Sequence, residues 1–107
     1  MGKVLYGDSG IEVIFDDRAM AHLQLVIGAK LRRNESFFFS WKDDPSAGDG
    51  RSSIWLDASI PLYFRYSQSK PVAINRDWLE VLTLSANSTA GLLFTSEPSG
   101  KATPPQE

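Results

Sequence analysis

The chain begins with two short apolar stretches, Lys3–Tyr6 and Ile11–Phe15, separated by the sequence GDSG. Glycine and aspartate tolerate the positive φ angles of tight turns, so this pattern predicts a β-hairpin. Apolar and other positions alternate in the second stretch, as expected of a strand with one face buried. We therefore expect the odd-numbered positions of that stretch to face the core.

Apolar positions then recur with helical spacing. One stripe of the expected 3.6-residue period contains Met20, Leu23, Ile27 and Leu31. It predicts a helix from about Arg18 to Arg32, which Asp16 or Asp17 would cap because a carboxylate accepts hydrogen bonds from the first free amides. Gly28 would allow this helix to pack closely against a sheet.

A second helix is predicted from about Arg76 to Asn87, with Asn75 as its N-cap. Its apolar stripe contains Trp78, Leu82, Ser85 and Ala86, with Leu79 beside it. The helix would end in the sequence NSTAG, whose composition is typical of turns.

Four further stretches read as strands: Glu35–Lys42, Ser53–Asp57, Ile60–Ser67 and Leu92–Thr95. The first carries Phe37, Phe39 and Trp41 on one face and Ser36, Phe38 and Ser40 on the other. The first two would pair as a hairpin with a long loop. Pro61 indicates that the third lies at an edge or begins there.

The predicted element order is β-β-α-β-β-β-α-β. Consecutive strands usually pair as antiparallel neighbours, so we expect a single α+β domain over residues 1–96. It would contain one mostly antiparallel sheet with both helices packed on one face. Residues 97–107 are rich in Pro, Gly, Ser and charge, which predicts a disordered tail.

Composition narrows the function. The 107 residues include no cysteine, which excludes disulfides, thiolate metal sites and a cysteine nucleophile and makes a reducing cytoplasm the simplest location. No stretch is long and apolar enough for a membrane helix.

The charge is unevenly distributed along the chain. The net charge is −2, but residues 18–76 carry nine Lys/Arg against five Asp/Glu, whereas residues 1–17 and 77–107 each carry one Lys/Arg against four Asp/Glu. A basic central surface facing an anionic partner is one interpretation; ordinary surface charge with acidic ends is the other.

Catalytic signals are weak. His22 is the single histidine, and a lone helical histidine is usually a surface or boundary residue. Asp16/Asp17 and Asp43/Asp44 are the carboxylate pairs open to Mg²⁺, but a helix cap and a solvated loop explain them better. No phosphate-binding loop or nucleophile elbow is present. We therefore expect no enzyme, no cofactor and no metal.

The basic positions are the best functional lead. Together with two aromatic side chains they form the candidate nucleic-acid site: Lys30, Arg32, Arg33, Arg51, Arg65, Arg76, Trp55 and Tyr63. Arginine beside exposed aromatic rings holds phosphates and stacks bases in single-strand binders. In the alternative interpretation the tryptophans pack in the core and the arginines pair with carboxylates.

Aromatic content supports a second hypothesis. A sheet with apolar residues on both faces must cover both, and two helices are few for this. Phe38, Trp55 and Tyr63 would then be buried by a partner protein or by a second copy in a homodimer.

Several long segments resemble a known family: MGKVLYG, DDRAMAHLQLVIGAKLRRNESFFFSW, RSSIWLDASIPLYFRYS and NRDWLEVLTLSANSTAGL. They are similar to a small uncharacterised family from actinobacteria and their phages, over about Met1 to Pro98. Its members often carry the label of ATP-dependent DNA ligase. The residues do not support that activity, because the nearest match to the ligase motif Lys-x-Asp-Gly is KDDP at residues 42–45, where proline replaces glycine. The resemblance carries over no catalytic residue and leaves an association with DNA as what it implies.

Overall fold

The computed structural model describes residues 1–43, 46, 48 and 50–98. Its elements follow the predicted order: β1 (Gly2–Tyr6), β2 (Ile11–Phe15), α1 (Asp17–Arg32), β3 (Phe37–Lys42), β4 (Arg51–Leu56), β5 (Leu62–Arg65), α2 (Arg76–Ala86) and β6 (Leu92–Leu93). The α+β class is confirmed. Neither helix in this part of the chain is long and apolar enough to span a membrane.

The strands form two three-stranded sheets instead of the one sheet that we expected. One sheet has the order β2-β1-β5, with both pairs antiparallel. The other has the order β4-β3-β6, with an antiparallel β3–β4 hairpin as predicted and a parallel β3–β6 pair. In the first of these sheets β5 pairs with β1, which is not its neighbour in sequence. The carbonyl of Pro61 accepts a hydrogen bond from the Gly7 amide at 2.9 Å, so this proline stands at the start of an edge strand.

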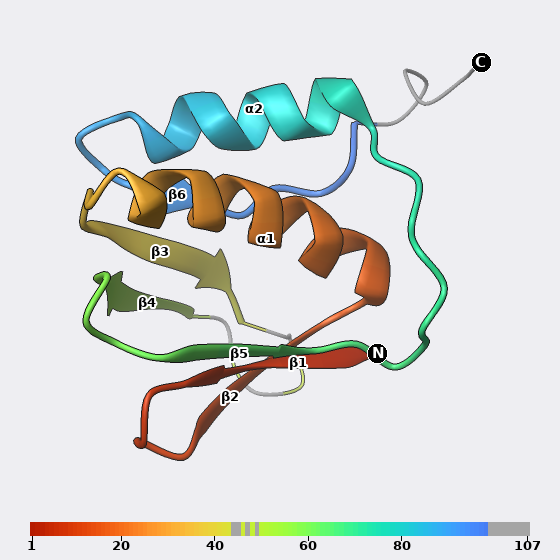
Figure 1. Cartoon of the computed structure of the whole chain (residues 1–107), viewed down its shortest axis with the longest axis horizontal. Coiled ribbons are helices and arrows are strands. Elements are labelled where there is room, and N and C mark those ends of the chain that lie inside the picture. Colours follow the sequence, from red (N-terminus) through yellow and green to blue (C-terminus); the bar gives the residue numbers. More distant parts are fainter. Residues whose placement is uncertain (44–45, 47, 49, 99–107) are drawn as a thin grey trace.

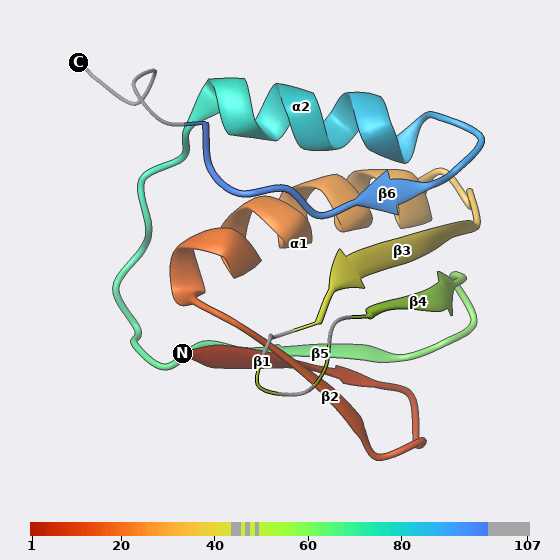
Figure 2. The same cartoon turned by 180° about the vertical axis from the view of Figure 1, so that it is seen from behind.

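Both helices lie on one side of the molecule and the β2-β1-β5 sheet on the other, with β3 and β4 between them (Figures 1 and 2). Phe15 on β2 connects these layers, because its ring lies 6.0 Å from that of Phe39 and 4.9 Å from that of Phe94. The hydroxyl of Tyr6 on β1 also donates a hydrogen bond to the main-chain carbonyl of Trp55 on β4. The two sheets therefore share one core.

The helices begin where the caps were predicted. The Asp16 carboxylate accepts a hydrogen bond from the Ala19 amide at 2.7 Å, and the Asn75 side chain caps α2. The stripe on α1 faces the core, with Met20, Leu23 and Ile27 buried. The expected role of Gly28 is wrong, because a Cβ there would meet nothing within 4 Å.

The expected surface position of His22 is also wrong: the side chain is fully buried, with its ring 4.5 Å from that of Trp78. Its Nε2 accepts a hydrogen bond from the Asn75 amide at 2.8 Å. Its Nδ1 lies 2.7 Å from the Arg18 carbonyl oxygen, which only accepts, so Nδ1 carries the proton. The position lies just outside the apolar stripe of α1, and the segment that leads into α2 covers it.

Glu97, the first residue of the predicted tail, is part of this arrangement. Its carboxylate accepts two hydrogen bonds from the Arg18 guanidinium, at 2.9 and 2.7 Å, and a third from the Asn75 side-chain amide at 2.8 Å. The Arg18 hydrogen bonds are the main cause that lowers the pKa of Glu97 from 4.5 to about 2, and Asn75 adds to them. The tail prediction for residues 99–107 lies outside the described residues.

The turn between α2 and β6 depends on a glycine. Gly91 has φ +88°, and a Cβ at this position would overlap the main-chain carbonyl oxygen of Phe38. The turn can therefore approach β3 closely only because residue 91 has no side chain.

We expect Gly91→Ala to destabilise the fold by roughly 1–3 kcal/mol from the positive φ alone, before the steric overlap is added. Gly28→Ala is the matched control: it lies in α1 with open space around it, so it should stabilise the protein by about 0.5–1 kcal/mol. Urea denaturation followed by far-UV circular dichroism measures both. Equal stability of the Gly91→Ala variant and the parent would contradict the close approach of this turn to β3.

The Glu97 ion pair predicts a pH dependence. A carboxyl group whose folded pKa lies below its unfolded value stabilises the fold above the unfolded pKa, and this contribution is lost as pH falls through the folded pKa. Stability should therefore decrease between pH 5 and pH 2. Glu97→Gln should lower the free energy of unfolding at pH 7 by about 1–2 kcal/mol, since Arg18 is partly exposed, and should make the acid dependence shallower. Glu80→Gln, on the exposed side of α2, is the control; a parent and a Glu97→Gln variant with parallel pH profiles would refute the prediction.

Candidate functional site

The register of β3 against β4 sorts the side chains of the hairpin onto two faces. Phe37 and Phe39 on β3 point into the core and are buried. The intervening positions point outward and pair across the strands as Phe38 with Trp55, Ser40 with Ser53 and Lys42 with Arg51. We call these six residues the β3–β4 face.

One end of the β3–β4 face is aromatic. The rings of Phe38 and Trp55 lie edge to face, with centroids 5.0 Å apart, and the side chains remain 50% and 44% exposed. Beside them the hydroxyls of Ser40 and Ser53 are 2.6 Å apart and hydrogen-bond to each other. Such an aromatic pair keeps large ring surfaces in contact with solvent, where a planar ligand can reach them.

The other end of the β3–β4 face is cationic. Lys42 and Arg51 are exposed, and within the described ranges no carboxylate lies at ion-pair distance from either. Asp43, which directly follows β3, instead accepts a hydrogen bond from the Ser52 hydroxyl at 2.8 Å. Two positive charges therefore stand on this face without a neutralising partner in the described part of the chain.

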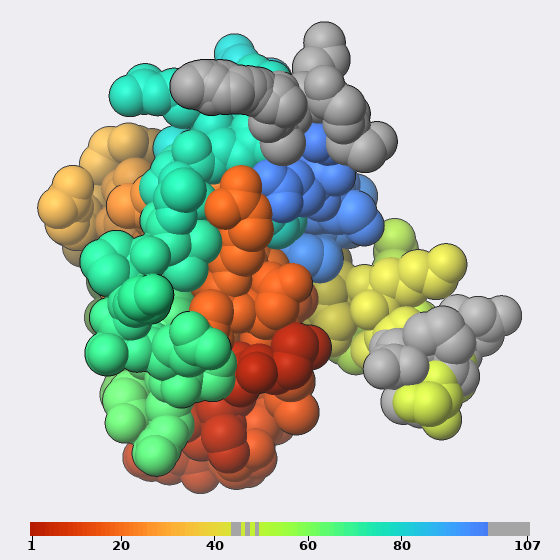
Figure 3. Space-filling model, turned by 90° about the vertical axis from the view of Figure 1, so that its right-hand side faces the viewer, coloured from red at the N-terminus to blue at the C-terminus, as the bar shows by residue number. Residues whose placement is uncertain are grey.

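A pocket of about 350 Å³ adjoins the cationic end. Lys42 and Arg51 line it together with Leu93, Phe94, Trp41 and Gly50. Figure 3 shows this end of β3 and β4, in yellow and lime, beside the blue segment that follows β6. Leu93 pairs with Ser40 in the parallel β3–β6 ladder and is 45% exposed, so it extends the outward-facing surface onto a third strand.

The structure divides the eight predicted site residues among several surfaces. Arg51 and Trp55 lie together on the β3–β4 face. Tyr63 and Arg65 lie on the outer face of the other sheet, where they pair with Leu5 and Lys3 of β1. Alternation along β4 and β5 explains both pairs, because residues two or four apart share a face.

The remaining cations lie at opposite ends of the helices. Lys30 contacts Glu35 at 3.0 Å and Arg33 contacts the same carboxylate at 3.1 Å, so the two cations share one negative charge. Arg32 is exposed at the same end of α1. Arg76 begins α2 at the other end, because the two helices run in the same direction (Figure 1).

The predicted nucleic-acid site omits Lys42, Phe38 and Leu93, although the protein-interaction hypothesis groups Phe38 with Trp55. The signal for the first two was available, since β3 alternates and places Phe38, Ser40 and Lys42 on one face. Leu93 could not be found in this way, because its position depends on a parallel pair between strands far apart in the chain.

The residues considered for catalysis and metal binding have structural roles in the fold. Both ring nitrogens of His22 are engaged in hydrogen bonds, and Asp16 caps α1. No group of three or more His, Cys, Asp or Glu side chains that could hold a metal occurs in the part of the chain that the structure describes. Of the ligase-like KDDP sequence, Lys42 lies on the β3–β4 face, and Asp44 and Pro45 fall outside the described residues.

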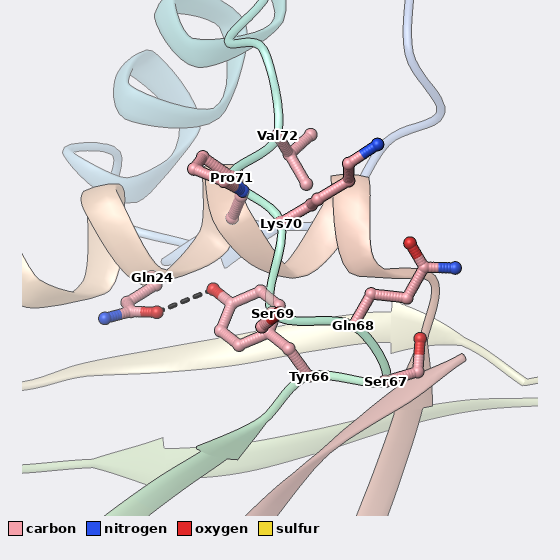
Figure 4. Close-up of a pocket in the computed structure, with 9 residues that line it drawn as sticks. Gln24, Tyr66, Ser67, Gln68, Ser69, Lys70, Pro71 and Val72 are labelled. Atoms are coloured by element: carbon pink, nitrogen blue, oxygen red, sulfur yellow. Dashed lines mark hydrogen bonds between the residues drawn. The ribbon is translucent and has the colours of Figure 1, made fainter.

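A larger groove of about 550 Å³ lies between α1 and residues 66–72 (Figure 4). On one side the Tyr66 hydroxyl donates to Gln24 at 2.6 Å, and burial raises the pKa of Tyr66. Ser67, Gln68 and Lys70 extend to the other side of the segment in Figure 4, so these polar groups do not converge on one point.

Asp17 shapes the beginning of this segment. Its carboxylate accepts hydrogen bonds from the Ser67 amide, the Ser67 hydroxyl and the Gln68 amide, each at 3.0 Å. The Ser67 amide bond is the main cause that lowers the pKa of Asp17. The second carboxylate of the Asp16/Asp17 pair therefore positions a loop.

The fold and the face define a small α+β domain that presents aromatic and cationic side chains on the exposed face of a sheet. The chain belongs to the family described as domain of unknown function DUF7882, whose model matches residues 1–97. That range ends at Glu97, the residue that closes the ion pair with Arg18. Neither the curated proteins nor the solved structures yielded a match to the chain.

Proposed function

We propose that this domain is a non-catalytic module of the cytoplasm that binds single-stranded nucleic acid through the β3–β4 face. The observation that carries the proposal is the presence, on one face of two paired strands, of an exposed aromatic pair and two cations without carboxylate partners in the described residues. Single-strand binders combine these two features.

Phe38 and Trp55 supply the stacking surface. Every base has a flat π-face, so stacking on aromatic side chains does not depend on the base sequence. The edge-to-face contact at 5.0 Å limits the freedom of both rings. Little side-chain entropy then remains to be lost when a base stacks on them.

Lys42 and Arg51 supply the phosphate contacts. A cation that neutralises a phosphate releases condensed counterions, so binding through this pair depends on salt. The net charge of −2 opposes long-range attraction of a polyanion. The contribution of these two residues is therefore local and short-range, which suits an accessory module better than a protein that coats DNA.

A second candidate function uses the same surface. Phe38, Trp55 and Leu93 are exposed apolar side chains, and a second copy of the chain would bury them. In a symmetric dimer each copy would also bring Lys42 and Arg51 into the interface, and like charges there oppose association. Size-exclusion chromatography with light scattering measures the oligomeric state and so distinguishes the two candidate functions. A dimer that becomes monomeric in the Phe38→Ala/Trp55→Ala double variant would favour dimerisation over nucleic-acid binding.

We expect Trp55→Ala to weaken binding of a fluorescently labelled single-stranded oligothymidine by roughly 5- to 150-fold, because stacking on an aromatic ring contributes about 1–3 kcal/mol per base. Fluorescence anisotropy measures the affinity. Tyr63→Ala is the matched control, since Tyr63 is an exposed aromatic side chain on the other sheet and should leave binding within about twofold. Equal losses in the two variants, or no binding by the parent, would refute the assignment of this face.

Replacing the two cations tests the electrostatic half of the proposal. In the Lys42→Gln/Arg51→Gln variant the slope of log affinity against log salt should become shallower by about 1.4, or about 0.7 for each lost phosphate contact on a single strand. Arg65→Gln/Arg76→Gln removes the same charge elsewhere and should leave the slope unchanged. An identical change of slope in both double variants would mean that net charge, and not this pair, drives binding.

A further inference from the structure

The pocket beside Lys42 and Arg51 contains an apolar part that stacking on Phe38 and Trp55 does not use. We infer that this pocket is a separate subsite for one nucleotide, with the base against Leu93 and Phe94 and its phosphate between Lys42 and Arg51. The inference rests on the proposed function and extends the ligand path from two strands to three.

The lining of the pocket has a cationic part and an apolar part, as a nucleotide has an anionic part and an apolar part. Lys42 and Arg51 form a cationic wall, and Leu93, Phe94 and Trp41 form an apolar one. A nucleotide has the same two parts, a flat base and an anionic phosphate joined by a sugar. At about 350 Å³ the pocket lies at the small end of the range for ligand sites, which favours a single nucleotide unit over a protein segment.

The apolar wall is held in place before any ligand arrives. The Leu93 amide donates to the Ser85 hydroxyl on α2 at 3.1 Å, and the Phe94 amide donates to the Ser40 carbonyl on β3 at 2.9 Å. The Phe94 ring packs 4.9 Å from Phe15 and 6.2 Å from Trp78. The wall therefore loses little freedom on binding, although Leu93 itself stays exposed to solvent.

The same positions give the path of the strand. Lys42 lies four residues beyond Phe38 on β3, or about 13 Å at the rise of an extended strand. Leu93 lies beside Ser40, between the level of Phe38 and that of Lys42, so the backbone that links a stacked base to the base in the pocket would pass next to the two cations. Among the described residues that line the pocket, the side chains other than these cations are apolar except for the indole N–H of Trp41, so these residues hold a base by contact and shape without reading its edge.

The first experiment compares Leu93→Ala with Leu84→Ala, an exposed leucine on α2 outside the pocket lining. We expect Leu93→Ala to weaken binding of the single-stranded oligothymidine by about 3- to 10-fold with an unchanged salt slope, and Leu84→Ala to remain within about twofold of the parent. A weaker affinity with an unchanged salt slope is expected because the substitution removes apolar contact with the base and no contact with a phosphate. Equal affinities of the two variants would overturn the subsite.

The second experiment uses the unmodified protein, so it does not depend on how a variant folds. Thymidine 5′-monophosphate is titrated against ¹⁵N-labelled protein, and amide shifts are expected at Arg51, Leu93 and Phe94. Shifts confined to residues around Phe38 and Trp55 would overturn the subsite and leave the proposed function standing. An absence of binding by both the mononucleotide and the oligothymidine would overturn both.

Discussion

The β3 strand is paired on both sides, and the rest of the molecule depends on the register that this imposes. Its pairing with β4 runs over six residue pairs and its pairing with β6 over two. A shift of one residue would exchange the two faces of β3 and move Phe39 from the core into solvent. The same alternation that buries Phe39 against Phe15 therefore also presents Phe38 and Lys42 outward. The register of β3 therefore determines both the packing of the core and the composition of the candidate site.

A network of hydrogen bonds connects the amino-terminal ends of both helices to the segment that follows β6. Arg18, His22, Asn75 and Glu97 come from three separate parts of the chain, and each hydrogen-bonds to at least one of the others. Asn75 has two roles, since its side-chain oxygen caps α2 while its amide groups bind His22 and Glu97. Removing one member would leave buried or half-buried polar groups unpaired, which costs more than the bond itself contributes.

Local patterns predicted most of the elements because they depend on near neighbours in the chain. The stripe through Met20 and Leu23 and the caps at Asp16 and Asn75 follow from helical period and side-chain chemistry. Long-range pairing did not follow in this way. Nothing near Leu62 reveals that β5 joins β1, and nothing near Leu92 reveals a parallel pair with β3, so one sheet was expected where two exist. The candidate site shows the same contrast between local pattern and long-range pairing. Arg51 and Trp55 share a strand, so its alternation predicts that they lie on one face, whereas Leu93 joins this surface only through the parallel β3–β6 pair.

The hydrogen bond from the Tyr6 hydroxyl to the Trp55 carbonyl has a consequence for the strand edge. β4 is the outermost strand of its sheet, and an open edge of this kind can recruit an extended segment from another molecule and start aggregation. The phenol from the neighbouring sheet already occupies an acceptor on that edge, so an incoming strand would have to displace it before pairing in register. Tyr6 thus occupies one main-chain acceptor on the outer edge of the strand that carries Trp55.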